Sequence, residues 1–472
     1  MEFANKGRGV AAGILAFAAT AALVYFGNGF EPRWPLMWIA PLPVLWLALR
    51  SRWWSAALVS GLALLTGCLN LWGYLRALHA PPTVWLAVFG IEAAAFALAV
   101  LLFRALALRG AIWSALVAFP AAVVAFEFAR NLLGPHGTGG SLAYSQIRCL
   151  PFLQLASVTG PWGITFVLLL FPAGVALAVH LRASNAAKSE RMLTVTLAIT
   201  VAVWVFGAVR LAVPQQGPNV RVGLAASDHD VAPAGAPTNR LLDGYAADIQ
   251  TLAAQGAQVV VLPEKIGMMD DSAVAGEDAI LQRLADRTGT TIVAGFDREM
   301  AGEARNQARV YRPGAVVATY NKEHLLPPFE LKFTPGTRQV LLPEAADRWG
   351  VAICKDMDFT GLSRTYGRDG AGLMLVPAWD FNIDRAWHGH IAIMRGVEDG
   401  FSIVRAAKNG YLTVSDNRGR ILAERRSDAA AFAALLANVP SGHSRTVFLL
   451  LGDWFGWLCM ALTVWGVARL VI

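Results

Sequence analysis

Long apolar runs dominate the first 213 residues of the chain. Seven such runs lie at 9–27, 34–49, 53–75, 83–103, 111–127, 160–181 and 192–213, and an eighth covers 454–472. Most are long enough to cross about 30 Å of hydrocarbon as a helix, and the second and fifth, which are shorter, are expected to tilt or pair. The pattern predicts a membrane α-helical bundle of about eight transmembrane helices, the first of which is retained rather than cleaved as a signal peptide.

The pattern changes between the seventh and eighth runs. Short segments with the composition of strands lie at 219–224, 259–262, 291–296, 316–320, 350–354, 372–377, 402–405 and 411–415. Helical stretches such as 245–255 and 279–287 are interleaved with them, which is the order of an α/β fold. We therefore expect a seven-helix transmembrane bundle over 1–213, an inserted α/β domain over 214–446 and a closing transmembrane helix over 447–472.

The composition agrees with a membrane protein. Hydrophobic residues make up 56% of the 472 residues and charged residues only 15%, against roughly 25% charged in an ordinary soluble chain. The net charge of +7 comes from Lys and Arg scattered in short clusters between the apolar runs, so nucleic acid is not an expected partner. With a cytoplasmic N-terminus, the cytoplasmic connections before residue 214 carry nine of these cations and the opposite side five, which places 214–446 outside the cytoplasm.

The four cysteines have neither the spacing of a zinc site nor that of a redox pair. Cys68, Cys149 and Cys459 lie in or near apolar runs, where a small buried hydrophobic residue is the expected role. A metal site is not expected, because the neighbouring histidines at 388 and 390 are poorly spaced for one helical face. Only Cys354 lies in the inserted domain, where it ends an apolar strand and is followed by a lysine and an aspartate.

Three predicted strands end at residues that could share one reaction. Glu264 follows the strand at 259–262, Lys322 follows that at 316–320, and Cys354 ends that at 350–354. A thiol with a pKa of about 8.5 is a weak nucleophile until a neighbouring group activates it. Glu264 could take the thiol proton as a general base. Lys322 and the backbone N–H after Cys354 could then stabilise an oxyanion.

Each of the three residues also has an ordinary structural interpretation. Cys354 could be a core residue at the end of an apolar strand, and Glu264 after a proline could be a favourable charge at a helix N-terminus. Lys322 in a turn could be a solvated surface charge. Their occurrence in one domain, each just beyond a strand, favours catalysis over these alternatives.

The segments around these residues resemble the Glu-Lys-Cys motifs of the nitrilase (carbon-nitrogen hydrolase) superfamily. They are Leu-Pro-Glu at 262–264, Tyr-Asn-Lys-Glu-His-Leu-Leu-Pro-Pro-Phe-Glu at 320–330 and Ile-Cys-Lys-Asp at 353–356. With the apolar runs, the resemblance sharpens to a divergent member of the apolipoprotein N-acyltransferase family and extends over nearly the whole chain. Further similar motifs are Asn70-Leu-Trp-Gly-Tyr74, Glu127 with Arg130, Tyr144-Ser-Gln146, the run from Ala378-Trp379 to Arg405, and Gly452-Asp-Trp454.

The resemblance implies a fold and a site. The fold is a nitrilase-like α-β-β-α sandwich, inserted before the last of eight transmembrane helices on the periplasmic side of a bacterial inner membrane. Cys354 would be the nucleophile, Glu264 the base and Lys322 the oxyanion stabiliser. The residues expected to bind substrate or support these three are Glu330, which aligns with a second active-site glutamate, and His324, Lys355, Asp356 and Trp379.

The reaction implied by the resemblance is a ping-pong acyl transfer. An sn-1 acyl chain passes from a phospholipid to Cys354 as a thioester, and then to the α-amine of a lipoprotein's N-terminal S-diacylglyceryl-cysteine. No cofactor or metal is required, the bilayer presents both substrates, and the enzyme is expected to be a monomer.

The chain departs from the family pattern close to the site. Cys354-Lys355-Asp356 stands in place of the usual Cys-Tyr-Glu, and Pro263-Glu264-Lys265 in place of Pro-Glu-Thr. A tryptophan expected soon after the first strand of the domain is absent from 225–233. These changes leave the thioester half-reaction in place and put the acyl acceptor in question.

Three functions of the chain are therefore consistent with these residues. The leading one is a membrane N-acyltransferase. The second is a membrane-bound amidase or acyltransferase with a different acceptor, such as water, and the third is an inactive lipid-binding relative, against which the intact Glu264, Lys322 and Cys354 argue. Mobile loops near 331–345 and 358–370 are expected beside the site, where their apolar and basic residues could cover it or contact lipid headgroups.

Overall fold

A computed structural model of the chain describes residues 2–215, 217–229, 231, 233, 235–344 and 348–471. The chain divides into two compact units. The first comprises 1–134, 140–212 and 451–472, and the second comprises 135–139 and 213–450. The five residues 135–139 thus belong to the second unit although they lie between two helices of the first.

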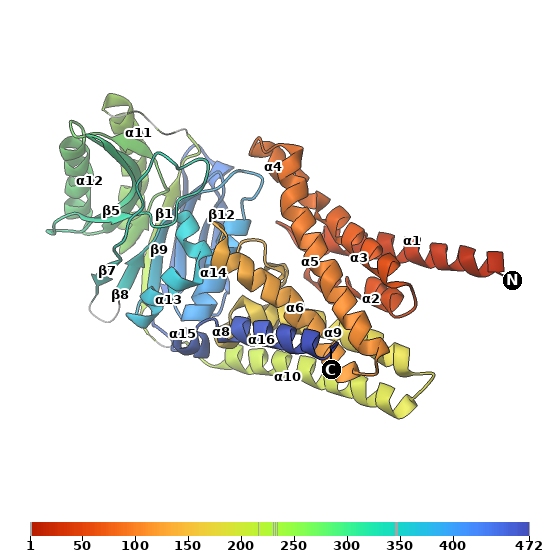
Figure 1. The fold of residues 1–472 in the computed structure, drawn as a ribbon. Coiled ribbons are helices and arrows are strands. Elements are labelled where there is room, and N and C mark those ends of the chain that lie inside the picture. Colours follow the sequence, from red (N-terminus) through yellow and green to blue (C-terminus); the bar gives the residue numbers. More distant parts are fainter. Residues whose placement is uncertain are drawn as a thin grey trace. The chain divides into compact units, whose positions relative to one another are not determined.

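The first unit is a bundle of apolar helices (Figure 1). Six of those in the described residues are long and apolar enough to cross a membrane. They are α1 (Glu2–Gly27), α3 (Trp53–Gly67) continued by η2 (Cys68–Leu71) and α4 (Trp72–Ala77), α5 (Pro82–Leu108), α6 (Ile112–Leu133), α9 (Pro161–Leu181) and α10 (Ala186–Ala212). The prediction that the chain is a membrane protein with several transmembrane helices is therefore confirmed.

Shorter helices complete the first unit. They are η1 (Trp34–Trp38), α2 (Leu42–Ala48), η3 (Leu142–Gln146), α7 (Leu150–Leu153), α8 (Ala156–Thr159) and α16 (Trp454–Ala468). Helix α6 packs against α5, α9 and α16, while α9 also packs against α10. The bundle core is therefore centred on α6 and α9.

The apolar run at 34–49 differs from the single tilted helix expected there. It forms the 3-10 helix η1 and the seven-residue helix α2, separated by a turn. Pro35, Pro41 and Pro43 explain the break, because proline lacks the N–H that a continuous helix requires and its ring clashes with the preceding turn. At about 1.5 Å per residue, α2 alone is much shorter than the hydrocarbon layer.

Polar side chains inside the bundle find partners within it. The Asn70 side-chain amide donates hydrogen bonds to the carbonyls of Tyr25 and Asn28, at 2.9 and 2.8 Å. It therefore ties η2 to the end of α1, which is the interhelical role expected of a polar residue in a membrane segment.

Glu127 and Arg130 on α6 do not serve as each other's closest partners. The Glu127 carboxylate accepts hydrogen bonds from the hydroxyls of Ser141 and Thr165 and from the Leu142 N–H, whereas Arg130 forms an ion pair with Glu92 on α5. The two charges of this motif therefore stabilise different contacts of the bundle.

The second unit contains two β-sheets. The first has the order β13-β1-β2-β4-β5-β6, with β3 also paired to β4, and the second has the order β12-β11-β10-β9-β8-β7. The strands of the first sheet are β1 (Asn219–Ala226), β2 (Val259–Val261), β3 (Gly267–Met269), β4 (Thr291–Met300), β5 (Glu303–Tyr311), β6 (Ala318–Asn321) and β13 (Ala433–Pro440). Those of the second are β7 (Val340–Pro343), β8 (Arg348–Val351), β9 (Leu373–Trp379), β10 (Ser402–Lys408), β11 (Tyr411–Ser415) and β12 (Ile421–Arg426).

Helices cover the outer faces of both sheets, which gives the predicted α-β-β-α sandwich (Figure 1). Apolar residues of β1, β2, β8, β9 and β10 form one core between the sheets. Helices α11 (Ala236–Ala254) and α12 (Val274–Thr288) form a second core with the first sheet. Helices α13 (Thr360–Arg368) and α14 (Trp387–Asp399) form a third with the second sheet.

The topology brings several strand ends to one place. Strands β1, β2 and β4 run parallel, as do β8, β9 and β10, and β2 contacts β9 across the sandwich. The segments that follow β2, β8, β9 and β10 therefore emerge near one another. This is the edge at which α/β folds place their chemistry.

Of the two loops expected beside the site, the one near 358–370 is mostly helix, whereas the one near 331–345 contains only a short strand and has no helix or strand over 331–339. Residues 340–343 form β7 and 360–368 form α13, while 345–347 lie outside the described residues. Phe359, an apolar residue of the loop expected near 358–370, stacks on the His324 ring at 3.7 Å between centroids.

Candidate active site

Cys354 lies on a sharp turn rather than at the end of a strand. Strand β8 stops at Val351, and Cys354 begins the 3-10 helix η4 (Cys354–Asp358) with a φ of +43°. A positive φ is unfavourable for a residue with a side chain and persists only where the surroundings hold it. The thiol is consequently presented on a tight bend at the carboxyl end of β8, and the residue is only 8% exposed.

Asp356 holds this bend in place. Its carboxylate accepts hydrogen bonds from the Ile353 N–H at 3.0 Å, the Tyr320 hydroxyl at 2.8 Å and the His324 N–H at 2.8 Å. The side chain is fully buried, where losing any of these partners would leave an unsatisfied polar group. Asp356 thus joins the turn that carries Cys354 to the segment that follows β6.

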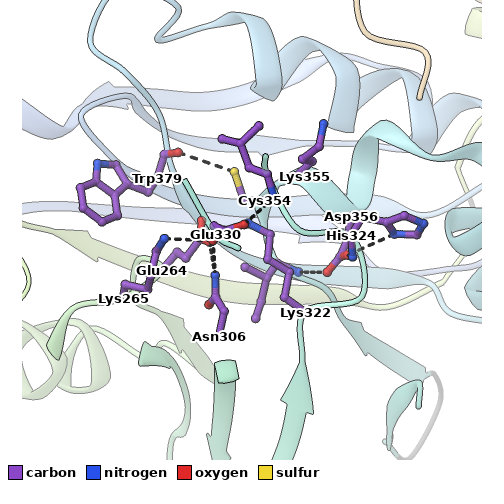
Figure 2. Close-up of polar contacts among 12 residues, drawn as sticks. Glu264, Lys265, Asn306, Lys322, His324, Glu330, Cys354, Lys355, Asp356 and Trp379 are labelled. Carbon is purple, nitrogen blue, oxygen red and sulfur yellow. Dashed lines mark hydrogen bonds and ion pairs between the residues drawn. The ribbon is translucent and has the colours of Figure 1, made fainter. Parts of the chain in front are cut away.

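Glu264, Lys322 and Glu330 form a buried ionic cluster beside this turn (Figure 2). The Lys322 Nζ lies 2.8 Å from Glu264 Oε1 and 2.8 Å from Glu330 Oε2. The three side chains are only 2–3% exposed. Although burial opposes its charge, the two carboxylates raise the pKa of Lys322 above its ordinary value, so the amine is a permanent cation.

Asn306 on β5 completes the cluster, and the sequence analysis missed it. Its side-chain amide donates to Glu264 Oε1 at 2.6 Å and to Glu330 Oε1 at 2.7 Å. The residue is 1% exposed. The segment 303–311 is too polar to be recognised as a strand, so nothing in the sequence indicated that this amide would face two carboxylates.

The backbone positions Glu264 and Lys322 independently of their side chains. The Glu264 N–H donates to the Ala378 carbonyl at 3.2 Å, and the Lys322 N–H donates to the Asn306 carbonyl at 2.9 Å. Gly295 on β4 packs directly beneath Glu264: a Cβ there would lie 2.6 Å from the Glu264 Cα. Only glycine allows this close approach, which fixes the acid at the end of β2.

The thiol of Cys354 is surrounded by groups of both charges. It donates to the Trp379 carbonyl at 3.6 Å, and the Arg405 guanidinium donates to the sulfur at 3.8 Å. Arg405 is itself held by a bidentate pair with Asp380. Burial and the negative charge of Glu264 raise the pKa of Cys354 despite the cations Lys322 and Arg405. The thiol therefore stays protonated at rest and requires a base at the moment of attack.

Glu330 is held as a carboxylate by two amines. Lys265 Nζ lies 2.9 Å from its Oε1, opposite the contact with Lys322. Although burial raises the pKa of this acid, Lys322 and Lys265 together lower it to about 2. Glu330 is therefore ionised at neutral pH.

Trp379 lies at the end of β9, beside two lysines. The Lys408 Nζ is 3.5 Å from the centre of the Trp379 ring, and the Lys265 Nζ is 5.0 Å from it. Lys408 also donates to the Lys265 carbonyl at 3.1 Å. Cation–aromatic contacts of this kind are stabilising when they are shielded from water.

Lys355 and His324 contact other groups than the thiol. The Lys355 side chain extends away from Glu264 (Figure 2), and its Nζ lies 3.2 Å from His136 Nδ1 and 3.5 Å from Asp358 Oδ2. His324 Nδ1 lies 3.3 Å from Asp356 Oδ1. The structure thus gathers Glu264, Lys322, Glu330 and Trp379 around Cys354, while Asp356, His324 and Lys355 lie behind the turn. In the described part of the chain, no group of three or more His, Cys, Asp and Glu residues could hold a metal ion.

Both units of the chain are similar to known proteins. Residues 12–174 match the family described as Apolipoprotein N-acyltransferase N-terminal domain, and residues 215–448 match the Carbon-nitrogen hydrolase family. The chain is 30% identical to the apolipoprotein N-acyltransferase of Geobacter metallireducens over 389 residues, which cover 74% of this chain and 73% of the relative. It is 27% identical to the enzyme of the same name from Gloeobacter violaceus, covering 62% and 61%.

Two further similarities concern the second unit. A deaminated glutathione amidase of Synechocystis is 28% identical over 209 residues, which cover 36% of this chain and 76% of the amidase. Among solved structures, an amidase from Nesterenkonia sp. covers 48% of this chain and 93% of its own, with a TM-score of 0.42 and 22% identity.

Proposed function

This chain belongs to the apolipoprotein N-acyltransferase family, and from that premise we propose that it transfers an acyl chain from a phospholipid, through a Cys354 thioester, to the α-amine of a lipoprotein's N-terminal S-diacylglyceryl-cysteine. The observation that carries this proposal is the buried contact of Glu264 with Lys322 beside a cysteine held on a positive-φ turn. A base, a cation and a thiol are thereby supplied by three separate strand ends.

The first half-reaction needs one proton to move twice. Glu264 takes the thiol proton as the sulfur attacks the ester carbonyl, and a tetrahedral oxyanion forms. Lys322 and the backbone N–H of Lys355 are the proposed donors to that oxyanion, since the first N–H groups of a helix have no partner within it. The intermediate then collapses to the thioester, and the departing lysophospholipid alkoxide takes the proton from Glu264.

The second half-reaction repeats these roles with an amine. The uncharged α-amine attacks the thioester carbonyl, and Glu264 takes a proton from its nitrogen. The amide forms as the Cys354 thiolate leaves, and Glu264 returns the proton to the sulfur. Both half-reactions therefore use the same base and the same oxyanion donors.

The membrane supplies both substrates in this proposal. Both are anchored by acyl chains, so a thiol near the bilayer surface can reach them in turn. We place the catalytic unit on the periplasmic side of the inner membrane, which the nine-to-five distribution of Lys and Arg supports. This sidedness requires that the short helices of 34–48 return the chain across the bilayer.

The proposal is tested with detergent-purified protein, a phospholipid carrying an isotope-labelled sn-1 acyl chain, and a synthetic S-diacylglyceryl-cysteine peptide. The labelled acyl group should appear on the peptide α-amine, as measured by tandem mass spectrometry. A matched peptide with an acetylated α-amine should gain no label. Labelled fatty acid without acylated peptide would instead favour hydrolysis.

Hydrolysis is the second candidate function, and a specific similarity favours it. The catalytic unit is 28% identical to an amidase over 209 residues, and Glu264 could deliver water to the thioester as readily as an amine. Lys265 and Lys355 stand where the family usually has threonine and tyrosine, and this difference near the site leaves hydrolysis as an alternative to transfer. The fatty acid released in the experiment above measures it directly.

A further inference from the structure

Lys265 lies in a site built for an ammonium group. Its Nζ is 2.9 Å from Glu330 Oε1, 5.0 Å from the centre of the Trp379 ring and 5.6 Å from that of Phe333. A carboxylate flanked by two aromatic faces is the arrangement that recognises alkylammonium ions. In this chain Lys265 supplies the ammonium at the carboxylate, and Lys408 Nζ also lies on the Trp379 ring, at 3.5 Å from its centre.

The site is at the exposed edge of the ionic cluster. The Lys265 side chain is 14% exposed, whereas those of Glu264, Lys322 and Glu330 are only 2–3% exposed. A group that enters the cluster from solvent therefore meets Lys265 before it meets the other charges. Removing the Lys265 ammonium from its place would leave Glu330 Oε1 with the Asn306 amide as its hydrogen-bond donor and open the position that the ammonium holds.

The backbone of Lys265 is fixed, so only its side chain can leave. The residue has a φ of +49°, and its carbonyl accepts a hydrogen bond from Lys408 at 3.1 Å. Gly295 packs against the same turn, where a Cβ would lie 3.0 Å from the Lys265 nitrogen. Rotation of a flexible lysine side chain needs no change in this backbone.

The site also lies close to the reacting groups. Glu330 shares Lys322 with Glu264, and the carbonyl of Trp379 accepts the Cys354 thiol hydrogen bond at 3.6 Å. An amine bound between Glu330 and the Trp379 ring would therefore lie among the residues that surround Cys354.

We propose that the site formed by Glu330, Trp379 and Phe333 binds the amine of the acyl acceptor, and that Lys265 is an internal ligand which the acceptor must displace. This inference rests on the proposed function and identifies Lys265 as a residue that determines acceptor specificity. The exchange replaces one ammonium by another, so the charge of the cluster is unchanged. The bound acceptor then loses one proton to water before its nitrogen attacks.

Displacement predicts that Lys265 weakens acceptor binding. A ligand whose site is open only part of the time binds with an affinity reduced by that fraction. Lys265→Ala should therefore lower the KM for the S-diacylglyceryl-cysteine peptide several-fold. Lys265→Arg should raise it, because a guanidinium grips a carboxylate through two hydrogen bonds. If Lys265 had only a structural role, both variants would have a lower kcat, and their KM values would not shift in opposite directions.

Lys332→Ala is the matched control. Lys332 Nζ also lies near the Phe333 ring, at 4.8 Å, but it pairs with Asp297 rather than with Glu330. Its side chain is 50% exposed. Loss of this neighbouring cation should leave the acceptor KM unchanged, so a shift caused by general charge near the site would be recognised.

The decisive experiment measures methylammonium binding by saturation-transfer NMR on the full-length protein in detergent, without turnover. Lys265→Ala should bind methylammonium saturably, whereas the wild-type protein and Lys332→Ala should not at the same concentrations. Equal signals from all three proteins would overturn the proposal, as would unchanged acceptor KM values in both Lys265 variants. If methylammonium binds Lys265→Ala but no acylated peptide forms in the wild type, the ammonium site stands and the proposed acyl transfer fails.

Discussion

Two clusters of buried charges flank the turn that carries Cys354. The front cluster contains Glu264, Lys265, Lys322 and Glu330, and the rear cluster contains Lys355, Asp358, Asp384 and His388. Both combine cations with carboxylates at low exposure. They differ in what they surround, because the front cluster lies beside the thiol, whereas the rear cluster binds the Lys355 side chain, which extends away from Glu264 (Figure 2).

The charges of the rear cluster are paired with one another. His388 lies between Asp358, at 3.6 Å, and Asp384, at 3.3 Å. Although burial disfavours its charge, these carboxylates raise the pKa of His388 to about 10. Lys355 and His388 in turn lower the pKa of Asp358 to about 2, against the effect of burial. We infer from this difference that buried charges next to Cys354 need not act on its thiol, and that side-chain direction decides which ones do.

The largest effect is expected from the front cluster. Glu264→Gln removes the carboxylate that we propose as the base while keeping a similar shape, so the rate of Cys354 acylation should fall by about 10²- to 10⁴-fold. The rate is measured by quenched-flow intact mass spectrometry with phospholipid. An unchanged rate would mean that another group takes the thiol proton, and the distinction between the clusters would fail.

A smaller effect on rate, with a clear effect on stability, is expected from Asp356→Asn. The carboxylate now accepts hydrogen bonds from the Ile353 and His324 N–H groups. The NH2 group of the new amide is itself a donor and could not accept either bond. Each mismatched buried bond costs about 1–3 kcal/mol, which corresponds to about 2–4 °C in Tm per kcal/mol for a unit of this size. Thermal melts of Asp356→Asn and of the control Asp243→Asn, on the exposed face of α11, should show the loss only in the former.

The rear cluster should make the stability of the protein depend on pH. The pKa of His388 in the folded protein is about 10, above the ordinary 6.5, so its contribution is complete below about pH 6.5 and is lost as the pH rises toward 10. His388→Gln should therefore lower Tm most at pH 6, and the difference from wild type should shrink by pH 10. A difference that stays constant over this range would show that His388 is not charged in the folded state.

The smallest effect on rate is expected from Lys355→Met. Because the Lys355 Nζ contacts His136 and Asp358 rather than the thiol, its loss should change the acylation rate by less than about tenfold, or about 1.4 kcal/mol in the barrier. The same intact-mass assay measures it. A loss as large as that of Glu264→Gln would place Lys355 in the reaction and erase the contrast between the clusters.

The sequence predicted the parts of the molecule that depend on pattern and local order. Apolar length identified the helices, strand-like runs identified most of the two sheets, and motif order brought Glu264, Lys322 and Cys354 together as candidates. Their joint position follows from strand ends that meet at one edge, which a sequence can reveal.

Features that depend on backbone turns and on contacts between residues distant in sequence could not be predicted. The strand at 348–351 ends before Cys354, and the positive φ of Cys354 is not encoded by residue type. Asn306 was missed because its strand is polar, and three prolines broke the expected helix at 34–49. The contact of Lys265 with Glu330 joins residues 65 positions apart, so no spacing rule could have indicated it.

The central claim is that Cys354 is acylated by phospholipid, and the most direct test is the intact mass of the purified protein after incubation with a phospholipid of defined sn-1 chain. The wild-type protein should gain the mass of that acyl group, neutral hydroxylamine should remove it, and Cys354→Ala should gain nothing. An adduct that persists in Cys354→Ala would contradict the claim, as would a wild-type protein that neither gains the acyl mass nor releases the fatty acid.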